Sequence, residues 1–405
     1  MEMQPLCIRC KGKGLCGKPC KILAKLQDYQ PKISDHFSGS SPPEIFVGHN
    51  FYPKVFTGIL APEEYGDTSN LSMPEQWHAE QADILKIMSY RGKMIYSRFI
   101  SSIKYEKNHL KDVMQEVALT SKPVSMEFKL KKKPTLKFQF DMHNPIIGNP
   151  APLKKVRFEE NPKIEKKVDY LANDIDVKAN TAMQELYTSR IPVSNIIKIL
   201  SAGMIGVKTS RKLVPTRWAI TATDSNLSEL LLDKVRYYQQ IPEFMLFHAE
   251  YIGNHYEILL LPGEFSFEVI EAKMPSSVWN QEGKETYVMK DYENWHGRKD
   301  YASEVAGGYY VARLAVSEYL NAIRRQASVL VMRECRPEYW APCGVGILRE
   351  TCRSAMQSKP EKFSSLKETL NAAQTRLKLK IETFLNNSKL LSEYKKQTKL
   401  TNFFN

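Results

Sequence analysis

The chain lacks any hydrophobic run long enough to cross a lipid bilayer. Its longest apolar stretches, Ile258 to Pro262 and Ala327 to Met332, are short beside the roughly 20 residues that a membrane-spanning helix needs. The residues after Met1 are polar and contain no apolar core of a secretory signal peptide. We therefore expect a cytoplasmic protein with no membrane partner.

Motifs of several common enzyme classes are also missing from the sequence. There is no Walker phosphate-binding loop, no glycine fingerprint of dinucleotide binding and no G-x-S-x-G nucleophile turn. No segment repeats at a fixed period. These absences argue against P-loop nucleotide hydrolases, Rossmann-type dehydrogenases, α/β hydrolases and repeat proteins.

Acidic residues are fewer than basic ones. The 405 residues include 58 Lys and Arg against 45 Asp and Glu, which gives a net charge of +13. A hydrophobic fraction of 42% is ordinary for a globular protein, and the length is sufficient for two or more domains. The positive charge favours a polyanionic partner, either nucleic acid or an anionic membrane surface, and charge alone does not choose between them.

Cysteine is scarce and unevenly distributed. Four of the seven cysteines, Cys7, Cys10, Cys16 and Cys20, fall in the first twenty residues with the spacing C-x2-C-x5-C-x3-C. In a reducing compartment such a cluster is more typical of metal ligands than of disulfides. We predict a structural Zn2+ bound by these four thiolates. An iron–sulfur cluster uses the same ligands and remains the alternative.

Several groups of cations are candidates for contacts with nucleic-acid phosphates. Basic residues surround the cysteines, where they either meet phosphates or offset the charge of the thiolates. Alternation between Met126 and Phe140 predicts a β-hairpin, whose basic tip either contacts a phosphate backbone or keeps a strand edge soluble. The candidates outside the cysteine cluster are Lys131, Lys132, Lys133, Arg211, Arg217 and Arg298.

Arg211 and Arg217 flank a Val-Pro step that we expect to lead into a strand from Trp218 to Thr223. They either contact phosphates or pair with carboxylates such as Asp224. Among the aromatic residues, Tyr339 and Trp340 are candidates for stacking on bases, although burial in an aromatic corner is the more frequent outcome for such residues.

Periodicity along the chain predicts a mixed α/β fold of the α+β kind with a β-rich central body. Strands are expected within 45–62 and 244–272 and at 328–333, and helices at 75–90, 174–189, 194–202, 300–325 and 346–357. An apolar stripe from Phe363 to Phe384 predicts one long helix over 361–391, packed on the protein's own core or on a second copy. We expect a four-cysteine zinc module at 1–27, an α+β domain at 28–274, a mostly helical domain at 275–392 and a flexible tail at 393–405.

The last nine residues carry a short interaction motif. Gln397, Leu400, Phe403 and Phe404 have the spacing Q-x-x-L-x-x-F-F. This pattern resembles a PIP box, the peptide that docks on the DNA sliding clamp PCNA. One tight turn would place the three apolar side chains on one side as a plug for a partner's pocket. The resemblance implies PCNA as a partner.

Titratable residues in the second half of the chain are candidates for a phosphodiester-cleaving site. Carboxylates could hold Mg2+ or Mn2+, and a histidine could serve the leaving group. Glu271-Ala272-Lys273 has the E-x-K ending of one nuclease motif, but that pattern is common by chance. The candidate catalytic residues are His255, Glu257, Glu271, His296 and Asp300.

Longer sequence blocks are dense in Arg, His, Asp, Trp and Tyr beside Gly and Pro. They are residues 41–48, 66–69, 151–153, 211–218, 253–255, 261–263, 296–301, 306–310 and 336–342. With the cysteine cluster, they resemble the archaeal Nre family of DNA repair proteins, most closely its NreA type, over nearly the whole chain. The resemblance implies work on damaged DNA in partnership with PCNA, and it implies no particular chemical activity.

Two classes of function therefore compete for the body of the protein. As an enzyme it would be a metal-dependent nuclease or phosphodiesterase acting on DNA. As a non-catalytic adaptor it would bind DNA or repair partners with salt-dependent affinity and turn nothing over. A protein directed to RNA or to free nucleotides is disfavoured by the clamp motif.

Overall fold

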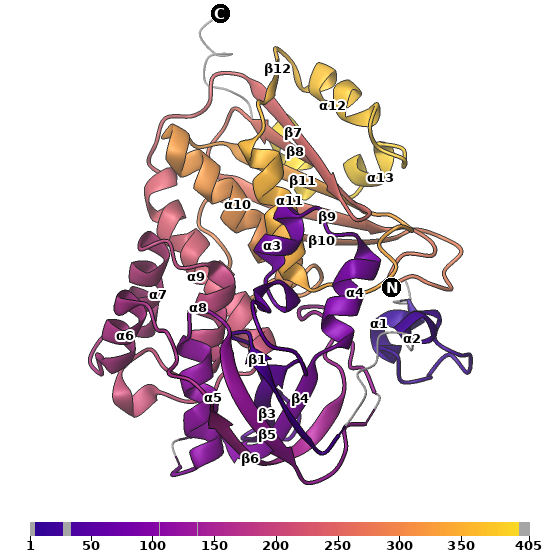
Figure 1. Cartoon of the computed structure of the whole chain (residues 1–405). Coiled ribbons are helices and arrows are strands. Elements are labelled where there is room, and N and C mark those ends of the chain that lie inside the picture. Colours follow the sequence, from indigo (N-terminus) through magenta and orange to yellow (C-terminus); the bar gives the residue numbers. More distant parts are fainter. Residues whose placement is uncertain (1–4, 27–33, 105, 136, 397–405) are drawn as a thin grey trace, which may run out of the picture. The chain divides into compact units, whose positions relative to one another are not determined.

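The computed structural model describes residues 5–26, 34–104, 106–135 and 137–396 (Figure 1). The chain forms two compact units. The first unit consists of residues 10–227 and 342–347, and the second of residues 1–9, 228–341 and 348–405. Each unit carries one six-stranded sheet with helices around it, which confirms the predicted mixture of helices and sheet.

The sheet of the first unit has the strand order β1-β5-β6-β4-β3-β2. Neighbouring strands are antiparallel except β4 and β6, which pair in parallel over three residues. Its strands are β1 (His36–Ser41), β2 (Ile45–Val47), β3 (Lys54–Ala61), β4 (Ile95–Ser102), β5 (Val124–Leu130) and β6 (Pro150–Phe158). The helices of this unit are α2 (Lys21–Leu26), α3 (Pro74–Ala79), α4 (Ile84–Gly92), α5 (His109–Leu119), α6 (Lys166–Asn173), α7 (Ala179–Thr188) and α8 (Val193–Ser201), with short 3-10 turns η2 (Ser69–Leu71) and η3 (Lys208–Ser210).

Helix α5 supplies much of the core of the first unit because its apolar residues recur at helical spacing. Val113, Met114 and Val117 are buried and join the inward-facing strand residues in one hydrophobic cluster. Strand β5 alternates buried and less buried positions, with Met126 and Phe128 facing that cluster. Period-2 strands and a period-3.6 helix thus meet at a single core.

The second sheet has the strand order β10-β9-β11-β8-β7-β12. Its strands are β7 (Phe244–Tyr251), β8 (Asn254–Leu261), β9 (Ser266–Lys273), β10 (Tyr287–Glu293), β11 (Ser328–Cys335) and β12 (Glu361–Phe363). Helices α10 (Gly307–Ile323), α12 (Leu366–Gln374), α13 (Glu382–Leu385) and α14 (Lys389–Lys396) belong to this unit. The division between the units falls within α1 (Leu6–Cys10), α9 (Thr216–Val235) and α11 (Val345–Gln357).

Helices cover both faces of the second sheet. On one face Leu259, Ile270 and Met332 pack against α12, α13 and α14 in a common cluster. On the other, Tyr309 of α10 makes an edge-to-face contact with Phe267, with ring centroids 5.1 Å apart. Strands β8 and β11 are buried at every position, which is expected for central strands covered on both sides.

Two local predictions in the first unit are wrong. The apolar residues near Met126 do not form a hairpin with those near Phe138, because β5 pairs with β1 and β6 instead. Period-2 alternation is the same whether a strand pairs with a neighbour or with a distant segment. Residues 218–223 belong to α9 and not to a strand, because Pro215 starts a helical turn in which its carbonyl accepts from the Ala219 N–H at 3.0 Å.

Two predicted long helices are interrupted. The pattern over 75–90 divides into α3 and α4, with Asp83 capping the start of α4. The pattern over 361–391 divides into β12, α12, α13 and α14, and Ser365 caps α12. The stripe nevertheless packs on the protein's own core, as one alternative predicted, because Leu377, Ile381 and Phe384 are buried there.

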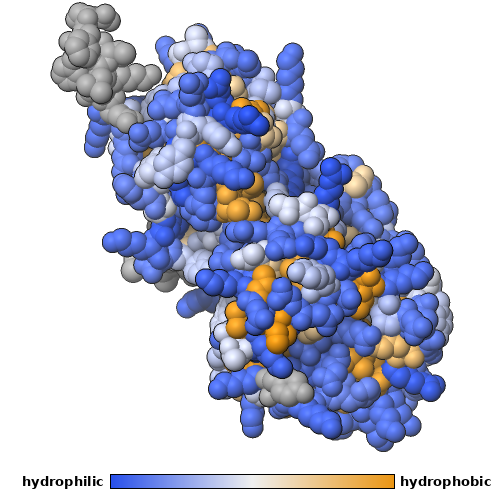
Figure 2. Space-filling view, turned by 90° about the vertical axis from the view of Figure 1, so that its left-hand side faces the viewer, coloured by the Kyte–Doolittle hydropathy of each residue, from blue (hydrophilic) through white to orange (hydrophobic). Residues whose placement is uncertain are grey.

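Other predicted elements are confirmed, including the strands at 244–272 and 328–333 and the helix at 346–357. The expected domain boundary near Lys273 lies at the end of β9. Strand β11, which follows that boundary in the sequence, lies between β9 and β8 in the same sheet. Within the described ranges, no helix is long and apolar enough to span a membrane. The face drawn in Figure 2 is mostly hydrophilic, with hydrophobic residues in small separate areas.

Candidate functional site

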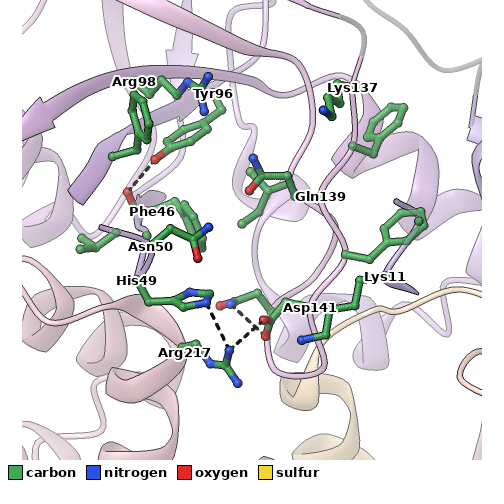
Figure 3. A pocket seen from close by; sticks show the side chains of 18 of the residues that line it. Lys11, Phe46, His49, Asn50, Tyr96, Arg98, Lys137, Gln139, Asp141 and Arg217 are labelled. Carbon is green, nitrogen blue, oxygen red and sulfur yellow. Dashed lines mark hydrogen bonds and ion pairs between the residues drawn. The ribbon is translucent and has the colours of Figure 1, made fainter. Parts of the chain in front are cut away.

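A cavity of about 560 Å³ lies in the first unit and combines cationic, aromatic and amide side chains (Figure 3). Four parts of the chain build it: the loop after α1, the β2–β3 hairpin, β4 and the loop between β5 and β6. Helix α9 adds Arg217 from its first turn. The lining residues are Lys11, Gly12, Lys13, Phe46, Val47, Gly48, His49, Asn50, Phe51, Phe56, Tyr96, Arg98, Lys137, Phe138, Gln139, Phe140, Asp141, Asn144, Ile147 and Arg217.

The lining of the cavity is strongly cationic. Five lining residues carry a positive charge, and Asp141 is the one carboxylate among the lining residues, which leaves a net charge of +4. Within the described part of the chain, Lys11, Lys13 and Lys137 have no carboxylate within ion-pair distance. The Arg98 guanidinium lies over the Phe56 ring, 4.3 Å from its centroid. Cations without carboxylate partners around a cavity are suited to an anionic ligand.

His49, Asp141 and Arg217 converge at one end of the cavity (Figure 3). Arg217 Nη1 lies 3.6 Å from Asp141 Oδ2 and 3.5 Å from His49 Nε2. Burial opposes ionisation of Asp141, but hydrogen bonding to His143 and the charges of His143 and Arg217 outweigh it and hold the pKa of Asp141 well below its ordinary value. Burial and the Arg217 charge lower the pKa of His49, so His49 is neutral at neutral pH.

Exposed aromatic side chains stand beside the cavity. Phe51 lines the cavity, is 79% exposed and has a backbone φ of +64°. Next in sequence, Tyr52 is 42% exposed and packs against Trp218, which is 46% exposed, with ring centroids 5.4 Å apart. Large aromatic rings left in water near a cavity are typical of binding surfaces.

The predicted phosphate-binding cations lie in different environments. Arg217 lines the cavity, and Lys131, Lys132 and Lys133 are exposed in the turn after β5. Arg211 instead donates to the carbonyls of Gly206, Ala172 and Asp174 at 2.6–2.7 Å, so its guanidinium holds backbone, not the carboxylate of Asp224. Arg298 donates to two main-chain carbonyls and lies 3.1 Å from Asp291 Oδ1.

The five predicted catalytic residues do not form a single site, although His255 and Glu257 are in contact. Glu257 of β8 pairs in register with Met332, and Glu271 of β9 pairs with Arg333, the next residue of β11. Paired residues share a face and successive residues alternate, so Glu257 and Glu271 lie on opposite faces of the second sheet. His255 shares the face of Glu257, while His296 and Asp300 lie exposed in the segment after β10.

The buried carboxylates of this set are already occupied by cations. Glu257 accepts from Arg376 Nε and Nη2 at 2.8 and 2.9 Å and from His255 Nε2 at 2.9 Å. Glu271 bonds to Arg333 and, at 2.9 Å, to Lys273 Nζ. Burial works against ionisation of Glu271, yet these two cations prevail and lower its pKa to about 2.

The cysteine segment is ordered around one sulfur. Cys10 is buried at the end of α1. Burial opposes its ionisation, but backbone hydrogen bonds from Leu15, Gly14, Cys16 and Lys13 outweigh it and lower the pKa of the Cys10 thiol. A sulfur surrounded by N–H groups fits a thiolate ligand. Across the described ranges, no three His, Cys, Asp or Glu side chains come together as a metal-binding group, so the four-cysteine zinc site stays a prediction.

The clamp motif lies outside the described residues, since Gln397, Leu400, Phe403 and Phe404 follow the last of them, Lys396. Sequence reasoning missed most of the cavity, including His49, Asn50, Gln139 and Asp141. One signal was available, because the block 41–48 that leads into His49 stood out in composition.

The fold and cavity define a two-unit α+β protein with a cationic, aromatic-lined site. Two family models match the chain: "Archaeal Nre, N-terminal" over residues 15–280 and "Archaeal Nre, C-terminal" over residues 293–403. The chain belongs to the archaeal Nre family. No solved structure gives a significant match.

Relatives with curated names align with most of the chain. The chain is 38% identical to "DNA repair protein NreA" and 36% identical to "DNA repair protein NreB", both of Archaeoglobus fulgidus. These alignments span 98% and 97% of this chain and 98% of each relative. The identity is 34% to "DNA repair protein NreA" of Haloferax volcanii, over 84% of this chain and 83% of the relative.

Proposed function

We propose that this chain is a DNA repair protein that binds DNA at the cavity of its first unit and is held at the sliding clamp PCNA by its C-terminal segment. The names of its relatives support the repair role. The observation that carries the DNA contact is the net charge of +4 around a cavity with exposed aromatic neighbours. Cations that meet phosphates and rings that stack on bases are the two features shared by proteins that bind single-stranded DNA.

The clamp tether complements a DNA site of modest size. A cavity of about 560 Å³ contacts only a short piece of DNA, so its intrinsic affinity is expected to be modest. Binding to a ring that encircles DNA would raise the local concentration of the protein without any further DNA contact. The proposal therefore assigns recruitment to the tail and DNA contact to the first unit.

Two sets of three lysines allow a charge-matched test of the DNA site. Lys11, Lys13 and Lys137 line the cavity, and Lys131, Lys132 and Lys133 are exposed in the turn after β5. Each set is replaced by alanine in the full chain, and affinity for labelled single-stranded DNA is measured by anisotropy at several salt concentrations. We expect the cavity variant to bind about tenfold more weakly, with a salt slope lower by about 2.

The turn variant loses the same charge and is expected to retain most of the affinity. An equal loss in both variants would move the DNA contact away from the cavity. If the unmodified chain binds neither single-stranded nor duplex DNA, the proposed function itself is wrong.

Between the two classes of activity, the structure gives more support to the non-catalytic adaptor. The carboxylates of Glu257 and Glu271 are bound to arginine or lysine and lie on opposite sheet faces. Labelled single-stranded, duplex and flap DNA should therefore stay intact with this protein in Mg2+ or Mn2+. Cleavage that disappears in Glu257→Gln or Asp300→Asn would instead favour the nuclease.

A further inference from the structure

The size and walls of the cavity restrict what part of DNA can enter it. Its volume of about 560 Å³ is in the range of sites that enclose one small molecule. A double helix cannot fit in such a space, whereas a single nucleotide that has left the helix can. Proteins that engage one base in this way rotate it out of the stack into a fitted pocket.

The cavity also offers groups for a base and not only for a phosphate. Asn50 and Gln139 carry side-chain amides at positions on opposite sides of the cavity (Figure 3). Within the described chain, neither amide makes a hydrogen bond to a protein group. Asparagine and glutamine amides both donate and accept, which matches the edges of nucleobases. The phenyl rings of Phe46 and Phe140 and the Arg98 guanidinium add flat surfaces to the lining.

At the mouth of the cavity, the Phe51 side chain is suited to fill the gap in the base stack that an extruded nucleotide leaves. Phe51 is the most exposed of the large hydrophobic side chains in the described chain, at 79%. It sits in the β2–β3 turn next to Asn50, and the Lys54 N–H donates to its carbonyl at 3.0 Å. A ring held out by a hydrogen-bonded turn can stack on a neighbouring base or enter the vacated step.

We propose that the cavity of the first unit takes one unpaired nucleotide of DNA, with its base between Asn50 and Gln139 and its phosphates at Lys11, Lys137 and Arg217, while Phe51 stacks on the adjoining base. The ligand class is therefore an extruded nucleotide within duplex DNA. This inference rests on the proposed DNA-binding function and adds the part of DNA that the cavity recognises, a single nucleotide.

Neutral His49 and the charged pair beside it fit this assignment. The Arg217 guanidinium is 3.6 Å from the Asp141 carboxylate, a separation at which Asp141 orients it while its other nitrogens can still reach a phosphate. His49 carries no charge at neutral pH because its pKa is lowered. Its imidazole therefore offers one donor and one acceptor and adds no further charge to the cationic end.

Three duplexes of one sequence test the proposal on the full chain. One is fully paired, one has a single bulged nucleotide, and one has the same bulge with the base removed. We expect the bulged duplex to bind about tenfold more tightly than the other two, since base stacking supplies this preference. Phe51→Ala and the double variant Asn50→Ala, Gln139→Ala should each lose the preference, so that the bulged duplex binds no more tightly than the paired one.

Tyr170→Ala is the matched control, because Tyr170 of α6 is 59% exposed and does not line the cavity. It should keep the preference for the bulge. Equal binding of all three duplexes by the unmodified chain would overturn the nucleotide pocket while leaving DNA binding intact. A preference that persists in both cavity variants would overturn it as well. Absence of binding to every duplex and to single strands would instead reject the proposed function.

Discussion

The core of the second unit contains charged residues that are buried together with partners of opposite charge. Arg333 is 5% exposed and Lys273 is 2% exposed, and both bond to Glu271. Arg333 Nη2 also donates to Asn254 Oδ1 at 2.6 Å. Such groups are costly to bury unless opposite charges and hydrogen bonds compensate for the lost water. The Glu271 network therefore holds β9 to β11 by charge as well as by the strand ladder.

Glu271→Gln tests this structural role. The variant leaves Arg333 and Lys273 buried without a counter-charge, so we expect the free energy of unfolding at neutral pH to fall by about 3–5 kcal/mol. Urea unfolding followed by circular dichroism measures the loss. The exposed Glu63 is the control, and Glu63→Gln should change the stability by less than about 0.5 kcal/mol.

The difference in stability between the unmodified chain and Glu271→Gln should depend on pH. The folded-state pKa of Glu271 is lowered to about 2 from an ordinary 4.5. A lowered pKa stabilises the fold above the ordinary value, and this contribution is lost as pH falls from about 4.5 toward 2. The difference in stability between the unmodified chain and Glu271→Gln should therefore shrink over that range. A difference that is constant with pH would contradict the assignment.

Residue type alone could not separate cavity-lining residues from structural ones. Arg211 and Arg217 stand six positions apart in one block, yet Arg211 holds carbonyls near the end of α6 and Arg217 lines the cavity. The difference depends on which distant segment each guanidinium meets, and a single sequence does not contain that pairing. Asp141 and His49 were missed for the same reason, because 92 positions separate them in the chain.

At the scale of elements, the cavity forms where irregular segments meet on a regular sheet. Strands β3 and β4 supply Phe56, Tyr96 and Arg98 from a paired ladder. The loops at 48–51 and 137–147 bring the amides and the acid. The sequence predicted strands within 45–62, which include β3, but it predicted neither β4 nor the loops, and the course of the loops is set by contacts such as the Gln139–Ile147 bridge. This explains why the fold class was predicted and most of the site was not.

The loop between Cys10 and Cys16 joins the predicted metal site to the cavity. Lys11, Gly12 and Lys13 line the cavity, and the backbone that follows them donates to the Cys10 sulfur. Gly12 has a φ of +77°, and a Cβ there would lie 2.8 Å from the Phe140 ring, so only glycine fits this close approach. Order in the cysteine loop therefore positions two of the cavity's cations.

Metal analysis of the purified chain tests the four-cysteine prediction. We expect about one zinc per chain, released by a strong chelator. Chelation should weaken single-stranded DNA binding, because Lys11 and Lys13 lose their fixed positions, and added zinc should restore it. The double variant Cys335→Ser, Cys352→Ser removes two buried cysteines outside the cluster and should retain the metal. Iron in place of zinc would favour an iron–sulfur cluster. Full DNA binding by a metal-free chain would contradict the predicted metal site and its role in positioning Lys11 and Lys13.

At the scale of the whole molecule, the proposed DNA-binding cavity and the helix that precedes the proposed clamp motif belong to different units. Helix α14 is fixed to the second unit, since Leu390 and Leu391 are buried and Tyr394 Oη donates to the Pro262 carbonyl at 3.1 Å. Nine residues follow α14 and contain the complete Q-x-x-L-x-x-F-F pattern. A peptide that continues from an anchored helix can engage a partner without any change in the sheet cores.

Replacing Phe403 and Phe404 with alanine tests the tether. The apolar plug is then removed, so co-elution with PCNA on a sizing column should be lost while the melting temperature stays unchanged. Asn402→Ala alters the same segment outside the motif spacing and should still co-elute. DNA affinity without the clamp should be equal in all three proteins, because the cavity lies in the first unit. With clamp loaded on DNA, only the two proteins that retain both phenylalanines should gain apparent affinity, by the effective concentration that tethering supplies. Co-elution that survives the double substitution would show that the motif is not the contact with PCNA.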